Sequence, residues 1–152
     1  LSNTIANGTD FTASYTYDIT SNITVNLDSN RTIGNITFTD STTSSHDLTI
    51  SGANILTLDV TTGFPTIDVT QSGRSLTIGS VSAGTDGLRK RGAGSLVLTA
   101  NNTFSGNTTI TGGTLTLSGS SGAIGSSSAI SLLSGGAFTV SNTSAANNTN
   151  RI

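Results

Sequence analysis

The sequence predicts an all-β fold of the parallel β-solenoid type, in which short strands from successive coils stack into sheets. Three observations support this prediction: apolar–polar–apolar triplets recur at a nearly fixed period, glycine and asparagine separate them, and small polar residues dominate the composition. Self-similarity at such a period is typical of solenoids, and we expect a right-handed parallel β-helix of about six or seven coils with a period near 20 residues.

The triplets supply the strands. A strand turns successive side chains to opposite faces, so the two apolar residues of a triplet face the interior and the middle residue faces solvent. One three-residue strand buries little, but stacked copies form a parallel sheet with interior apolar columns. The first residues of one series are almost evenly spaced along the chain: Ile36, Leu56, Leu76, Leu96 and Leu115. A second, less regular series lies between them: Ile23, Leu48, Ile67, Leu88, Ile110 and Ile130.

The two series predict at least two strands in each coil, and we expect a third. The middle residues of the first series would form an exposed threonine column, interrupted by Val97: Thr37, Thr57, Thr77, Thr116 and Thr139. Glycines between the triplets supply the positive φ angles of sharp corners. We expect the solenoid to occupy residues 15–140, with an N-terminal arm or cap at 1–14 and a polar C-terminal tail or cap at 141–152.

Composition narrows the class of protein. Ser and Thr make up about a third of the 152 residues, only 9% are charged, and 5% are aromatic, which indicates a thin cross-section with most side chains solvated. The absence of cysteine excludes disulfides and thiolate metal sites. The net charge of −2 is small and its acidic residues do not cluster, so nothing indicates nucleic acid as a partner. No apolar run is long enough to span a bilayer. Because the chain begins at Leu1, we expect a processed product or a fragment.

Residues 87–125 carry a more specific pattern. They contain Gly-Leu-x-Lys-x-Gly-x-Gly-x-Leu-x-Leu, then Asn-x-Phe-x-Gly-x-Thr, then Gly-x-Leu-x-Leu. This pattern resembles the passenger-associated transport repeat of bacterial autotransporters. The matching residues are Gly87, Leu88, Lys90, Gly92, Gly94, Leu96, Leu98, Asn102, Phe104, Gly106, Thr108, Gly113, Leu115 and Leu117.

The resemblance implies a β-helical passenger segment that is secreted to the bacterial cell surface and has no catalytic residues. Combined with the absence of a capping helix at either end, it leads us to expect a structural or adhesive element. Its partners would be further copies stacked head to tail into a fibre, the next coils of a longer passenger, or a cell-surface or glycan ligand. The alternative is a β-helical protein that binds or cleaves carbohydrate.

Candidate chemical groups are few. The predicted period would bring Asp40 near Asp59, and Asp47 near Asp68, as two-carboxylate pairs, although Asp is also common at strand ends. His46 precedes Asp47 and is expected to be a solvated loop residue. We therefore expect no enzyme activity, cofactor or metal. The basic run 89–91 is expected to be a solvated turn.

Eight Asn-x-Ser/Thr sequences occur, only slightly more than chance predicts. Surface glycosylation is a hypothesis for a secreted polar chain, and four of these residues are the candidate sites: Asn22, Asn35, Asn101 and Asn107.

Overall fold

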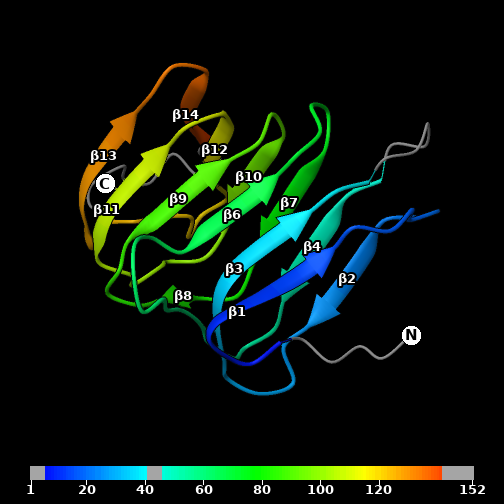
Figure 1. Cartoon of the computed structure of the whole chain (residues 1–152), viewed down its shortest axis with the longest axis horizontal. Coiled ribbons are helices and arrows are strands. Elements are labelled where there is room, and N and C mark those ends of the chain that lie inside the picture. Colours follow the sequence, from blue (N-terminus) through cyan, green and yellow to red (C-terminus); the bar gives the residue numbers. More distant parts are fainter. Residues whose placement is uncertain (1–5, 41–45, 142–152) are drawn as a thin grey trace.

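The computed structural model describes residues 6–40 and 46–141, and in these ranges the chain forms strands and no helix. Fourteen strands make two parallel sheets that lie face to face (Figure 1). The eight-stranded sheet contains β1 (Gly8–Tyr15), β3 (Arg31–Phe38), β5 (Leu56–Leu58), β6 (Thr66–Val69), β8 (Ser82–Ala83), β9 (Leu88–Arg91), β11 (Gly106–Ile110) and β13 (Ser127–Leu132). The six-stranded sheet contains β2 (Ile23–Asn26), β4 (Leu48–Ser51), β7 (Ser75–Ile78), β10 (Ser95–Leu98), β12 (Gly113–Ser118) and β14 (Gly136–Ser141).

The six-stranded sheet shows the solenoid directly. Its order β2–β4–β7–β10–β12–β14 follows the chain, and every pairing is parallel, so each coil adds one strand. The inward residues form two columns: Ile23, Leu48, Leu76, Leu96, Leu115 and Phe138, and Val25, Ile50, Ile78, Leu98, Leu117 and Val140. The parallel β-solenoid fold is thus confirmed, with about six coils and a mean period near 23 residues.

The expected period is wrong for the N-terminal coils. In the six-stranded sheet the step from Leu48 to its partner Leu76 is much longer than the step from Leu96 to its partner Leu115. In the eight-stranded sheet Ile36 pairs with Ile67, so this coil is longer still.

The longer N-terminal spacing also breaks the triplet series. The first two triplets, at Ile36 and Leu56, belong to the eight-stranded sheet, whereas those at Leu76, Leu96 and Leu115 belong to the six-stranded sheet. The triplets are evenly spaced in the sequence although they belong to two sheets, because the longer N-terminal coils shift them from one sheet to the other. The predicted threonine column is therefore wrong as well, and the residues that do stack on the outer face of the six-stranded sheet are Thr24, Thr49, Thr77, Val97, Thr116 and Thr139.

The extra residues of the long N-terminal coils form a third side of the solenoid. The long strand β3 pairs with β5 through Arg31–Ile33 and with β6 through Asn35–Phe38, so its two halves lead to different neighbours. The third side continues from β5 to β8 and then, beyond the named strands, to hydrogen bonds from Thr103 N to Ser82 O and a bridge between Asn101 and Ala123. A third strand exists, but only in part of the solenoid.

The segment expected to be an N-terminal arm or cap contains a strand, and most of the expected C-terminal tail lies outside the described residues. β1 begins at Gly8, inside the segment 1–14 for which an arm or cap was predicted, and it pairs with β3. Of the predicted C-terminal tail, only Ser141 falls within the described residues, where it ends β14. No helix in the described part of the chain has the length and hydropathy needed to cross a membrane.

Candidate functional site

The transport-repeat segment lies in the regular C-terminal coils and covers β9 to β12. Its apolar motif residues point inward and are fully buried: Leu88, Leu96, Leu98, Phe104, Leu115 and Leu117. The segment 89–91, predicted to be a solvated turn, instead belongs to strand β9. That prediction is wrong because the alternation of Leu88 and Lys90 places both side chains in the core.

Lys90 occupies a position in an interior apolar column. In the eight-stranded sheet it pairs with Ile67 on one side and with Ile110 on the other, and its exposed fraction is 0%. Its ammonium group donates hydrogen bonds to the carbonyl oxygens of Arg91, of Gly92 at 3.0 Å and of Gly112 at 3.3 Å. One buried cation thus binds carbonyl groups from the corners of two successive coils. A charge can be buried only when it is satisfied in this way.

The environment of Lys90 also changes its proton affinity. Burial disfavours the ammonium form and lowers the pKa of Lys90 to about 8, while the nearby carboxylate of Asp68 opposes part of this decrease. Lys90 is therefore charged at neutral pH but titrates well below an ordinary lysine.

The motif glycines let neighbouring corners touch. Gly92 has a φ of 76°, and a Cβ placed there would lie 2.1 Å from the carbonyl oxygen of Val69. Gly113 has a φ of 60°, and its Cβ would lie 2.1 Å from the carbonyl oxygen of Gly94. Both positions need a left-handed backbone and have no room for a side chain, so only glycine fits.

Asn102 and Thr108 complete the interior of the repeat. The Asn102 amide nitrogen donates to the carbonyl oxygens of Ala100 at 2.9 Å and Ala123 at 3.0 Å, and its Oδ1 accepts from the Ser82 amide at 2.9 Å. Asn102 therefore joins three coils from a buried position. The buried Thr108 hydroxyl lies 2.8 Å from the Ser127 hydroxyl. Each buried polar side chain of the motif has partners, as interior polar groups require.

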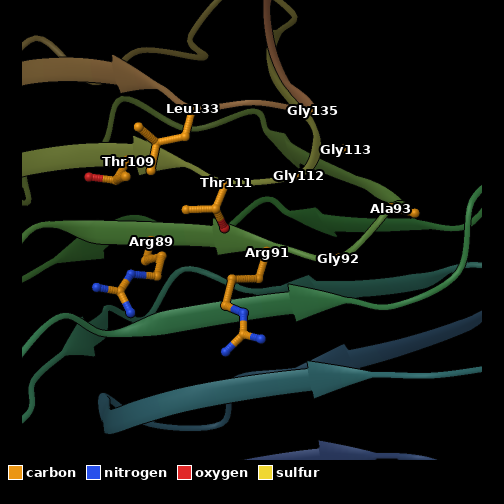
Figure 2. Close-up of a pocket in the computed structure, with 10 residues that line it drawn as sticks. All are labelled: Arg89, Arg91, Gly92, Ala93, Thr109, Thr111, Gly112, Gly113, Leu133 and Gly135. Atoms are coloured by element: carbon orange, nitrogen blue, oxygen red, sulfur yellow. The ribbon is translucent and has the colours of Figure 1, made fainter.

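The outer face of the same coils is hollowed. The hollow has a volume of about 730 Å³, and Figure 2 shows the residues that line it. Arg89 and Arg91 point outward from β9, while Thr109 lies on the next strand along the solenoid, β11, and Thr111 lies just beyond the end of β11 (Figure 2). The remaining lining is mostly the backbone of the glycine corners, with Leu133 at one side.

The two arginines have weak partners. The Arg89 guanidinium lies over the Phe64 ring, 5.3 Å from its centre, which is within the range of a cation–π contact. Arg91 Nε lies 3.9 Å from Asp68 Oδ2, and the Arg91 side chain is 57% exposed. Among the described residues, Arg89 takes part in no ion pair. The hollow therefore carries two cationic groups that remain accessible from solvent.

The predicted carboxylate pairs are not formed. Asp40 is buried with Arg74, whose Nε lies 3.7 Å from its Oδ2, and Asp59 accepts a hydrogen bond from the Thr9 hydroxyl instead. Asp47 Oδ1 accepts from the Ser75 amide at 2.8 Å, whereas Asp68 lies beside Arg91. In the described ranges no three His, Cys, Asp or Glu residues form a group suited to a metal ion.

His46 lies outside the strands, as a loop residue does, but it is only partly exposed. Its backbone amide donates to Asp40 Oδ2 at 3.4 Å.

Three of the four candidate glycosylation residues hold neighbouring coils together. The Oδ1 atoms of Asn22, Asn35 and Asn107 accept hydrogen bonds from the Asp47 amide, the Thr66 amide and the Ser128 hydroxyl. Asn101 is exposed and forms the bridge to Ala123. These contacts give each asparagine a structural role between neighbouring coils, and glycosylation stays a prediction.

These features define a parallel β-solenoid whose C-terminal coils are built around a buried lysine and packed glycine corners. Residues 88–117 match the family model described as Passenger-associated-transport-repeat, which confirms the resemblance noted in the sequence. The matched segment starts at the strand that contains Lys90 and ends in β12. No curated protein and no solved structure significantly matches the chain.

Proposed function

We propose that this chain is part of a secreted bacterial surface passenger, and that its role is structural and adhesive. The transport repeat supports this proposal because such repeats are associated with autotransporter passengers. The fold supports a structural role, because stacked coils make a stiff rod with a regular polar surface.

The single observation that carries the structural role is that, within residues 6–40 and 46–141, both ends of the solenoid have uncovered strands. At the C-terminal end Leu132 continues the interior column of Lys90 and Ile110, yet it is 54% exposed. At the N-terminal end Ile23 and Val25 point inward but are only partly buried. Among the described residues, no further strand covers β13 and β14 at one end or β1 and β2 at the other.

Open ends of this kind favour head-to-tail addition. The ladder pairings of the named strands are all parallel, so a second copy placed above the first presents strands that run in the same direction. Unpaired edges are templates for pairing with another chain, and a heterologous contact between unlike ends generates an open filament. In a longer passenger the same ends would be covered by the adjoining coils.

Negative-stain electron microscopy and sedimentation velocity across a dilution series test this proposal. We expect filaments of even width for the wild-type chain, and short rods for Leu132→Lys, which places a charge on the open end. Ile55→Lys is the matched control, because Ile55 is 39% exposed but does not lie at an end. Short rods from the wild-type chain at every concentration would overturn fibre formation, as would equal filaments from Leu132→Lys.

A further inference from the structure

We propose that the hollow over β9 and β11 binds an acidic polysaccharide, with Arg89 and Arg91 as the anion-binding groups. The proposal adds a ligand class to the adhesive role proposed above and depends on that role, but it does not require fibre formation. The alternation of β9 carries the argument, since it buries Lys90 and presents the arginine on each side of it to solvent.

The arrangement suits an extended anionic chain. The two arginines are two residues apart on one strand, so their backbone positions are separated by roughly 7 Å on the same face. Guanidinium groups bind carboxylate and sulfate oxygens with paired hydrogen bonds, and they are less strongly hydrated than lysine ammonium groups. The ring of Phe64 under Arg89 and the carboxylate of Asp68 beside Arg91 restrict both side chains before a ligand binds.

The uncharged residues that line the hollow suit the hydroxyl groups of a sugar. Thr109 pairs with Arg89 across the ladder, and Thr111 follows just after the end of β11, where its hydroxyl group donates to the Lys90 carbonyl oxygen at 3.1 Å. Two threonine hydroxyl groups therefore lie one coil further along the solenoid than the arginines. Neighbouring strands are about 4.8 Å apart, so a chain that runs along the solenoid axis reaches both strands. The glycine corners leave the hollow open, and at Gly135 a Cβ would have no atom within 4 Å.

The local charge favours an anion although the whole chain is acidic. Asp68 is the carboxylate beside Arg91, and the buried ammonium of Lys90 interacts with it from the inner side of the sheet. With Arg89 and Arg91 in the lining and Lys90 partly offsetting Asp68, the hollow has a surplus of positive charge. The net charge of −2 opposes non-specific attraction to polyanions, so binding would have to depend on this hollow.

Calorimetric titration with three oligosaccharides tests the proposal: a polygalacturonate fragment with carboxylates, a heparin fragment with sulfates, and a neutral dextran fragment. We expect at least one acidic oligosaccharide to bind at low salt, weaker binding as salt rises, and no binding of dextran. Loss of a charge-assisted hydrogen-bonding group should weaken binding by about tenfold for each arginine, and Arg89→Gln with Arg91→Gln should remove it.

Arg31→Gln is the matched control, because it removes the same charge from the same sheet but lies outside the hollow. It should bind as the wild-type chain does, and circular dichroism should show that all variants keep the fold. Failure of both acidic oligosaccharides to bind, or equal binding by the double variant, would overturn the proposal. Leu132→Lys should bind normally even where it forms no filaments, so failure of the site and failure of the fibre are distinguishable.

Discussion

The N-terminal and C-terminal halves of this solenoid follow the same fold with different regularity. From Leu76 to Leu96 and on to Leu115 the coils keep close to the period that the sequence predicts. From Ile23 to Leu48 and on to Leu76 both steps are clearly longer. The short coils include the transport repeat, and the long coils include the third-side strand β5.

The halves also close their corners differently. Glycine corners pack on backbone in both halves, but a Cβ at Gly92 or Gly113 in the regular half would lie 2.1 Å from a carbonyl oxygen, whereas a Cβ at Gly52 in the irregular half would lie 3.0 Å from one. In the irregular half a side chain also holds a corner to the next coil, as in the bond from the Ile55 amide to Asn30 Oδ1. The comparison teaches that the short coils of the repeat coincide with the closest backbone packing at glycine corners, whereas the long coils have looser corners.

The largest expected effect comes from filling a packed corner. Gly92→Ala should lower the free energy of unfolding by about 3 kcal/mol or more, because it adds a steric clash to the cost of a left-handed alanine. Gly63→Ala is the matched control, since Gly63 has a φ of 85° but nothing within 4 Å of its Cβ, and it should cost only about 1 kcal/mol. Urea denaturation followed by circular dichroism measures both. Equal losses of unfolding free energy in the two variants would show that the corner at Gly92 is packed no more tightly than the open turn at Gly63.

The sequence was sufficient to predict the fold class, the inward triplets and the transport repeat. It was not sufficient to predict register in the long coils, because a triplet such as Leu56–Leu58 has the same alternation in either sheet. The role of Lys90 was missed because it lies between two arginines and reads as part of a charged surface. Its alternation with Leu88 was the one signal that placed it inside. The hollow depends on side chains from three coils, which no single motif specifies.

The second-largest loss of stability is expected from replacing a buried asparagine of the regular half, and an exposed asparagine of the irregular half serves as the comparison. Asn102→Ala should cost about 2–3 kcal/mol, because it removes three hydrogen bonds from a buried group and leaves the Ser82 amide without its acceptor. Asn30→Ala removes the acceptor of the Ile55 amide at an exposed corner, where water can replace it, and should cost about 0.5–1.5 kcal/mol. Thermal denaturation of the two variants ranks them. The reverse ranking would contradict the view that the repeat depends on satisfied interior polar groups.

Replacement of Lys90 should have a smaller effect at neutral pH than Gly92→Ala or Asn102→Ala. Lys90→Met keeps most of the side-chain volume but removes the donor to the corner carbonyls, so it should cost about 1–2 kcal/mol at pH 7.

The pH dependence of the free energy of unfolding shows whether titration of a buried Lys90 contributes to stability. The pKa of Lys90 falls from 10.5 to about 8 on folding, so between these values the unfolded chain binds more protons. The free energy of unfolding should therefore rise from pH 8 towards pH 10 in the wild-type chain. Burial raises the pKa of Tyr15 above 10, so its opposing contribution starts only above this window. Lys90→Met should lack the rise, and an identical rise in both proteins would contradict a buried titrating lysine.

Coil register is the central claim of this account, and engineered disulfides test it most directly, because the chain has no cysteine of its own. Thr49 and Thr77 pair on neighbouring strands, whose backbones lie about 4.8 Å apart, a separation that a disulfide can bridge. Thr57, which lies one step of the predicted period before Thr77, belongs to the other sheet. In dilute, oxidised protein analysed by mass spectrometry, Thr49→Cys with Thr77→Cys should form an intramolecular bond, and Thr57→Cys with Thr77→Cys should not. The opposite result would mean that the coils stack at the uniform period predicted from the sequence and would contradict the register described above.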